Sequence, residues 1–280
     1  MTKNIISASI FLLSLSSCST TIDRTVPISK EFEASSQLIT LETPTWRVSG
    51  TVYNMDIGSY SVTQSNTTWV SRDKELIDRT KDTNFINYIL FDDVLSVITE
   101  EFEVEGTQRF SFSINDEDAS VSTSKCEIFS HSLSKETISV DSNTSVIRTS
   151  PNMNFRQKTF LICTIEQNNS VWTLSLLSNK NESMKVSLSN NDETYDIKSI
   201  SEIISIVDGV NGLEKRHSAP WRSLHSGLEF FYDNQQVAAF SFVGNPKIWL
   251  NESLSTDSKE LMYAVNYSLA MFNWLDSDWR

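Results

Sequence analysis

Apolar and polar residues alternate over several stretches of the chain, and this period of two predicts β-strands. The stretch "FLICTIEQNNSVWTLSLL" contains two such runs, joined by a polar turn at residues 167–170. The residues predicted to face inward are Leu161, Cys163 and Ile165 on one strand and Trp172, Leu174 and Leu176 on the next. The stretch "LEFFYDNQQVAAFSFVG" predicts a second hairpin, because Asp233 and Asn234 tolerate the positive φ of a tight turn.

Shorter runs with the same alternation predict further strands. These are residues 46–53, in which Trp46, Val48, Gly50 and Val52 would share one face, and residues 60–64, 110–114, 125–129, 185–188 and 247–250. Residues 83–97, "TNFINYILFDDVLSV", are ambiguous between a helix and a strand.

The segment "ELMYAVNYSLAMFNWLDSDWR", from Glu260 to Arg280, has a different pattern and predicts a helix. Asp257 followed by Glu260 resembles an N-terminal capping box, with Asp in the usual Ser or Thr position. Apolar residues cover every side of the helical wheel, which is typical of a helix surrounded by protein. At about 1.5 Å per residue, the apolar stretch that ends at Leu275 is about 24 Å long, short of the roughly 30 Å hydrocarbon core of a bilayer, so a buried core helix is predicted.

Many antiparallel strands followed by an apolar C-terminal helix resemble the tubby-like architecture of tubby domains, phospholipid scramblases and LURP-type proteins. The resemblance rests on the "VAAFSF" strand, the "KIWL" strand and the terminal helix. It implies a mainly β (α+β) fold, with an antiparallel β-barrel or strongly curved sheet packed around the helix. No residue signature of phosphoinositide binding is present to extend the resemblance to a ligand. The alternative is an ordinary α+β domain whose last helix packs into the concave face of a sheet.

The N-terminus contains a basic Lys3, an apolar run and the residues Leu15-Ser16-Ser17-Cys18. The run is typical of an export signal, and the last four residues resemble the bacterial lipobox. The resemblance implies a signal peptide at 1–17 and a mature chain that begins at Cys18, carrying diacylglyceryl and palmitoyl-type chains. Ser19 follows the cysteine, which by the family's sorting tendency implies the outer membrane, facing the periplasm. The alternative is an ordinary cleaved signal with an incidental cysteine.

Composition then divides and constrains the rest of the chain. Residues 18–37 are polar and unpatterned, which predicts a lipidated flexible tether, and residues 38–280 are expected to form a single β-rich domain. The formal charge of −13 disfavours nucleic acid and anionic lipid headgroups as partners, although simple solubility is a sufficient reason for it.

Two cysteines remain once Cys18 is assigned to lipidation. Cys126 and Cys163 form an even pair in an oxidising compartment, so we predict a disulfide between them. In the chain-entropy model, closing this loop would stabilise the fold by about 4 kcal/mol. Two buried free thiols are the alternative.

Candidate ligand-binding residues occur in "KRHSAPWRSLHSG". Arg216, His217, Arg222 and His225 form a basic group on an acidic chain, which could bind an anionic ligand or a partner, although a solvated loop is the plainer interpretation. Asp116, Asp118 and Glu127 match part of an EF-hand spacing, but Val121 occupies the position that needs Gly, and a polar turn is the better interpretation. No catalytic residue, cofactor or metal site is predicted.

Two functional hypotheses follow. The first is a lipid-anchored envelope protein with a non-catalytic binding or structural role, acting on a protein partner or on an apolar ligand inside the barrel. The second is an envelope hydrolase whose site has no recognisable motif. Perturbed titratable groups gathered in a cleft would favour the hydrolase.

Overall fold

The structure, a computed structural model, describes residues 22–44, 55–83, 96–117, 119–140, 146–179, 182–207, 215–218 and 225–276. The helices are α1 (Lys30–Ala34) and α3 (Thr256–Leu275). The strands are β1 (Ile22–Thr25), β2 (Ser36–Thr40), β3 (Met55–Ile57), β4 (Tyr60–Thr67), β5 (Ser71–Thr83), β6 (Ser96–Asp116), β7 (Ala119–Val140), β8 (Val146–Gln167), β9 (Ser170–Asn179), β10 (Lys185–Ser189), β11 (Thr194–Ile200), β12 (Ile204–Val207), β13 (Lys215–Ser218), β14 (Gly227–Tyr232), β15 (Gln235–Ser241) and β16 (Lys247–Asn251).

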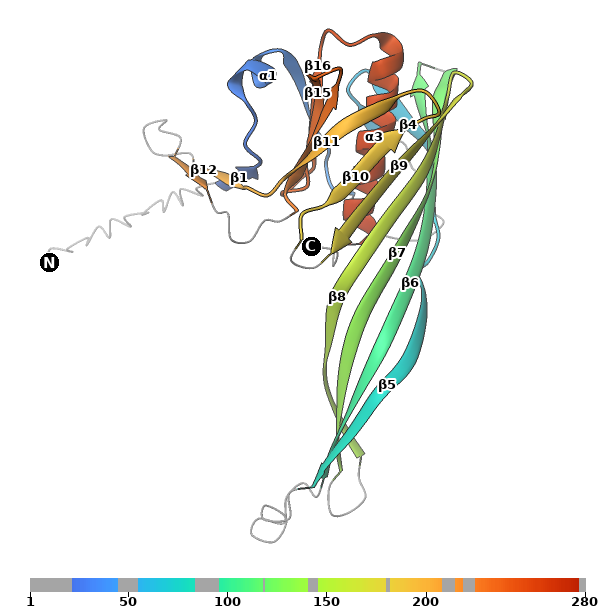
Figure 1. Cartoon of the computed structure of the whole chain (residues 1–280), viewed down its shortest axis with the longest axis vertical. Coiled ribbons are helices and arrows are strands. Elements are labelled where there is room, and N and C mark those ends of the chain that lie inside the picture. Colours follow the sequence, from blue (N-terminus) through green and yellow to red (C-terminus); the bar gives the residue numbers. More distant parts are fainter. Residues whose placement is uncertain are drawn as a thin grey trace, which may run out of the picture.

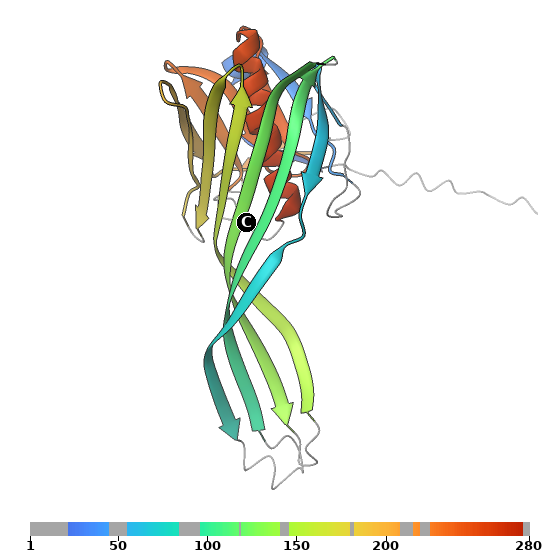
Figure 2. The same ribbon diagram turned by 90° about the vertical axis from the view of Figure 1, so that its right-hand side faces the viewer.

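A 13-stranded antiparallel sheet curls into a nearly closed barrel, as the sequence predicts (Figures 1 and 2). Twelve strands follow the order β2-β16-β15-β14-β11-β10-β9-β8-β7-β6-β4-β3, and β5 is paired to β6 beside this path. The two end strands approach each other at Gly58, whose φ is +65°. A Cβ added there would lie 3.1 Å from Ile39 Cδ1 and 2.5 Å from Tyr263 Oη, so only glycine fits between the sheet ends and the helix.

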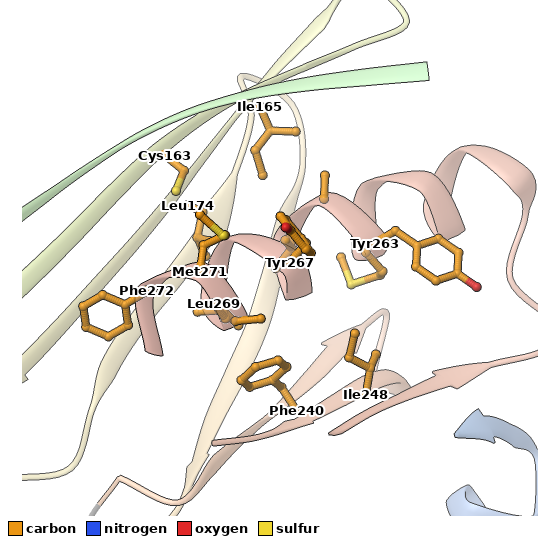
Figure 3. Close-up of a cluster of buried hydrophobic side chains, with 14 of the residues drawn as sticks. Cys163, Ile165, Leu174, Phe240, Ile248, Tyr263, Tyr267, Leu269, Met271 and Phe272 are labelled. Atoms are coloured by element: carbon orange, nitrogen blue, oxygen red, sulfur yellow. The ribbon is translucent and has the colours of Figure 1, made fainter. Parts of the chain in front are cut away.

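The helix α3 lies inside the barrel and is buried on every side from Glu260 to Trp274, which confirms the predicted core helix. Figure 3 shows its side chains between strands on opposite walls of the barrel. The labelled residues are Tyr263, Tyr267, Leu269, Met271 and Phe272 from the helix, Cys163, Ile165 and Leu174 from one wall, and Phe240 and Ile248 from the other. Burying side chains of this size stabilises a fold by about 1.5–3 kcal/mol each.

The predicted start of this helix is wrong by two residues. Ser255 is the N-cap, and its hydroxyl accepts a hydrogen bond from the Ser258 backbone N–H at 3.3 Å. Asp257 instead lies in the first turn, where its negative charge interacts favourably with the positive end of the helix dipole. The error arose because Ser and Asp are both good capping residues and occur close together here.

A smaller sheet, β1-β12-β13, and the short helix α1 lie beside the barrel. Val26 and Phe32 are buried against Trp249 and Val243 in a second apolar cluster on the outside of β15 and β16. The flexible tether predicted for residues 18–37 is therefore wrong for the described part, residues 22–37, which contains β1, α1 and the start of β2. Residues 18–21 lie outside the described residues.

The predicted strands that fall within the described residues are present, and several are much longer than expected. The two predicted hairpins are confirmed, with positive φ at Asn168, Asn169, Asp233 and Asn234 in their turns. The predicted strand at 46–53 and most of the ambiguous stretch at 83–97 lie outside the described residues. The structure adds strands that were not predicted, among them β5 and β11.

Four strands extend well beyond the barrel as a twisted, four-stranded ribbon, which we call the blade (Figures 1 and 2). It comprises β5 and residues 96–107 of β6, 129–140 of β7 and 146–157 of β8. Among the residues whose side chains the structure describes, none of the buried members of the main apolar core comes from residues 71–107 or 129–157. The blade therefore projects from the barrel without contributing a described side chain to the main apolar core.

Candidate functional site

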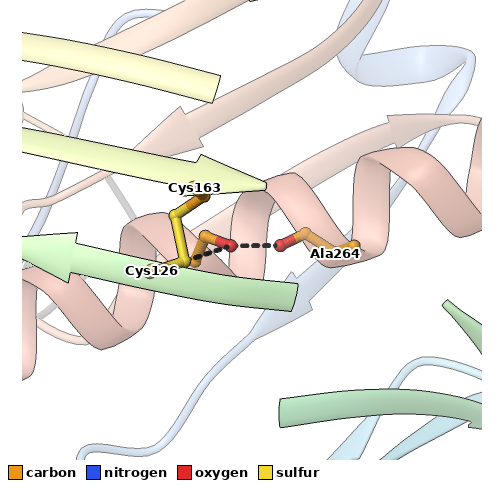
Figure 4. Close-up of a disulfide and its surroundings, with 4 residues drawn as sticks. Cys126, Cys163 and Ala264 are labelled. Carbon is orange, nitrogen blue, oxygen red and sulfur yellow. Dashed lines mark hydrogen bonds between the residues drawn. A yellow bond between two sulfur atoms is a disulfide. The ribbon is translucent and has the colours of Figure 1, made fainter. Parts of the chain in front are cut away.

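The predicted disulfide is present and lies in the core. Cys126 and Cys163 are direct partners in the β7–β8 register and are bonded through their sulfur atoms. Both are buried under α3, where the Ser268 hydroxyl donates to the Ala264 carbonyl at 2.8 Å and its oxygen lies 3.7 Å from Cys126 Sγ (Figure 4). Its surroundings are those of a structural crosslink.

The basic residues predicted as one loop occupy different places. Arg216 and His217 belong to β13, paired with Ile206 and Ser205 of β12, so this part of the predicted loop is a strand. Arg222 and Cys18 lie outside the described residues. His225 is instead at the barrel, with its Nε2 3.3 Å from Ser178 Oγ at the end of β9.

A group of titratable side chains meets near the N-terminal end of α3. Glu260 is 5% exposed and accepts a hydrogen bond from Gln167 Nε2 at 3.1 Å. Burial raises the pKa of Glu260, and the nearby Asp257 raises it further, while the Gln167 hydrogen bond opposes both. Burial and the Glu260 charge likewise raise the pKa of Tyr60. Glu260, Gln167 and Tyr60 are buried, whereas Asp257 is exposed at the start of the helix.

A buried ion pair lies near the opposite end of α3. Arg156 Nη2 donates to Asp276 Oδ1 at 2.6 Å, and both side chains are largely buried. Asp276 is the C-cap of the helix, so the pair ties the end of α3 to β8 where the blade begins. Within the described residues, no group of His, Cys, Asp and Glu has an arrangement that could hold a metal ion.

The outer face of the blade carries a row of opposed carboxylates on β5 and β6, which we call the acidic ladder. Direct cross-strand pairs are formed by Asp73 with Glu105, Glu75 with Glu103, and Asp78 with Glu101. Residues directly opposite in antiparallel strands lie on the same face, about 4.5–5.5 Å apart, and like charges there are destabilising. The chain thus concentrates negative charge on one face of a ribbon that contributes no described side chain to the main apolar core.

Among the side chains that the structure describes, two basic residues of the blade contact this ladder. His131 Nε2 donates to the Glu103 carboxylate, and Lys135 Nζ lies 3.0 Å from Glu101 Oε1. Both residues come from β7, the strand that pairs with β6 on the side away from β5. Among the described residues, the other four ladder carboxylates have no ion-pair partner.

Apolar side chains on β7 and β8 adjoin the ladder on the same face, and we call them the apolar row. Leu133 is opposite Phe155 in the blade, and Phe129 is opposite Phe160 where the blade meets the barrel. Leu133, Phe155 and Phe129 are 37%, 42% and 40% exposed. Because Glu103 is opposite Leu133 in the β6–β7 register, the acidic and apolar parts are continuous.

The other face of the blade is largely paired with itself. Lys74 forms an ion pair with Glu136 and lies 3.6 Å from the centroid of the Phe102 ring. Arg79 pairs with Glu100 at 3.4 Å. The two faces therefore differ. On the face opposite the ladder, basic side chains form ion pairs with the acids, whereas most of the ladder carboxylates have no ion-pair partner among the described residues.

Sequence reasoning did not find the outer face, although a signal for it exists. In "EEFEVE" the acids Glu101, Glu103 and Glu105 recur with a period of two, which on a strand places them all on one face. Their partners on β5 are recognisable only once that strand is known, because all its residues are exposed and it has no apolar alternation.

No protein-family model, curated protein or solved structure matches this chain. None of the helices in the described part of the chain is long and apolar enough to span a membrane. The structure itself defines the chain as a nearly closed antiparallel barrel around a C-terminal helix, with a projecting blade.

Proposed function

We propose that this chain is a lipid-anchored cell-envelope protein with a non-catalytic binding role, and that it acts on a protein partner through its surface. The observation that carries the proposal is the position of α3, which occupies the barrel interior with every residue from Glu260 to Trp274 buried. A barrel that carries an apolar ligand needs that space. A filled barrel with an uncompensated projecting face favours a surface partner instead.

The residues Leu15-Ser16-Ser17-Cys18 support the anchoring part of the proposal. Two or more acyl chains on Cys18 would suffice for stable attachment, since a single chain binds only marginally. Because Ser19 follows the cysteine, we place the protein at the outer membrane, facing the periplasm. The tubby-like resemblance is part of the same proposal, and it concerns the arrangement of barrel and helix alone.

Metabolic labelling with a palmitate analogue tests the anchor. The full chain is expected to take up label and to sediment with envelope membranes, whereas Cys18→Ser is expected to do neither. A second variant, Cys126→Ser/Cys163→Ser, controls for cysteine loss and should retain the label. Equal labelling of Cys18→Ser and the unmodified chain would contradict lipidation at this residue.

Native mass spectrometry of the exported, unlipidated chain tests the filled barrel. We expect the mass of the disulfide-bonded chain with no retained acyl compound. A stoichiometric co-purified lipid would instead make ligand carriage the function, and would require α3 to leave the barrel.

A further inference from the structure

We infer that the outer face of the blade is a docking surface for a basic, amphipathic segment of a protein partner. The inference rests on the proposed binding role and adds the chemistry of the partner. The surface consists of the acidic ladder on β5 and β6 and the apolar row on β7 and β8.

Charge is the first argument. In each of the three acid–acid pairs of the ladder, the two carboxylates lie directly opposite each other on β5 and β6, although like charges in that position destabilise a sheet. Asp73, Glu75, Asp78 and Glu105 have no ion-pair partner among the described residues, so their field is directed at solvent. Lysine or arginine side chains spaced along a partner strand would relieve this repulsion, and complementary potentials also raise association rates.

Exposed apolar area is the second, independent argument. Leu133 and Phe155 form a cross-strand pair, and each exposes more than a third of its surface, 37% and 42%. Phe129 and Phe160 form a second apolar pair on the same face, with ring centroids 6.4 Å apart, and the pair His131 and Lys158 lies between the two apolar pairs in the register. Exposed apolar side chains gathered on one face and rimmed by polar ones are typical of protein interaction sites.

The same charge excludes the other classes of occupant. A second copy of the chain has a net charge of −13 and would bring the same acidic ladder to the interface. Nucleic acid and anionic lipid headgroups are repelled for the same reason. A polypeptide segment with basic and apolar sides is complementary to both halves of the face.

Titration of the full exported chain with a peptide of alternating Lys and Leu tests the inference. Saturable binding is expected, weakening as salt rises because exposed charges are screened. A Lys–Ser peptide of equal length is expected to bind about tenfold more weakly, the effect of losing apolar contacts. Equal binding of the two peptides would overturn the amphipathic part of the inference.

Matched variants locate the binding. Asp73→Asn/Glu75→Gln/Glu105→Gln removes three ladder charges without breaking an ion pair, and is expected to weaken binding about tenfold. Glu31→Gln/Glu202→Gln/Glu252→Gln removes the same charge from exposed residues elsewhere and should change binding less than about twofold. Equal weakening by both sets would show attraction to net charge alone and would overturn the inference.

The apolar row has its own pair of variants. Leu133→Thr/Phe155→Thr is expected to weaken binding by about tenfold, while Leu38→Thr/Val171→Thr, at residues 53% and 56% exposed, should leave it unchanged.

Palmitate labelling separates the two proposals, since a labelled, membrane-bound chain that binds no peptide would overturn only the partner's chemistry. Loss of labelling would overturn the proposed anchor instead.

Discussion

At the scale of single residues, the buried Glu260 shows how the fold accommodates a carboxylate inside an apolar barrel. Its carboxylate is 5% exposed and its hydrogen bond comes from Gln167 on the β8–β9 hairpin. Burial disfavours the ionised form, which raises the pKa, and Asp257 adds to the effect. A neutral side chain of the same shape would avoid the cost of ionisation and could still accept the hydrogen bond.

Glu260→Gln is therefore expected to stabilise the protein at neutral pH. The folded-state pKa of Glu260 is raised above 4.5, so the native state binds this proton more tightly than the unfolded state does. The free energy of unfolding therefore falls as the pH rises through that pKa. The variant lacks this loss, so its urea midpoint should exceed that of the unmodified chain at neutral pH and converge with it below about pH 4.5. A lower midpoint for the variant at neutral pH would contradict this account.

Tyr195 should lose its proton at a pH well above the ordinary tyrosine pKa of 10. Burial, followed by the charge of Glu193, raises the pKa of Tyr195 to about 12. Since the native state retains the proton, this side chain costs stability only as pH rises from 10 towards 12. Absorbance titration should show a late phenolate step that Tyr195→Phe removes.

The disulfide should contribute a large part of the net stability. It closes a loop with a sequence separation of 37 residues, for which chain entropy gives about 4 kcal/mol. Cys126→Ser/Cys163→Ser is expected to lower the free energy of unfolding in urea by about that amount. The unmodified chain measured under reducing conditions should agree with the variant, and Cys18→Ser should not change the free energy of unfolding.

At the scale of elements, α3 is both the last helix and the centre of the core. Phe272→Ala is expected to lower the free energy of unfolding by about 3–5 kcal/mol, because the cavity would be surrounded by barrel residues that cannot collapse onto it. Lys259→Ala in the first turn is the matched control and should cost less than about 0.5 kcal/mol. A chain ending at Asp257 should not fold, as judged by loss of its cooperative thermal transition.

Strand prediction succeeded where one face of a strand is buried. The apolar alternation at Leu161, Cys163 and Ile165, and its counterpart on β9, marks the side that packs on α3. β5 has no buried residue along its length, so hydrophobic patterning had nothing to detect. For the same reason, the parts of β6 and β8 that belong to the blade were not predicted, although their parts in the barrel were.

At the scale of the whole molecule, the blade and the barrel should be separable. We expect a variant lacking residues 71–106 and 131–155, with each gap closed by a tight Asn-Gly turn, to fold cooperatively, because no described residue of these segments belongs to the main core. It keeps Arg156 and the ion pair with Asp276. Its thermal transition should survive while binding of the Lys–Leu peptide is lost, and loss of the transition would show that the blade supports the barrel.

The sequence by itself determined the β-rich class, two hairpins, the buried terminal helix and the pairing of Cys126 with Cys163, because each depends on local periodicity, turn chemistry or cysteine count. Only the tertiary structure decided that Ile39 and Gly58 bring the sheet ends together over α3, and that Phe32 and its neighbours pack as a second core. It placed His217 on β13 of the small sheet, whereas His225 lies at the barrel beside Ser178. It also decided that acids from β5 and β6 face one another. These features depend on strand register between distant segments, which a one-dimensional pattern does not specify.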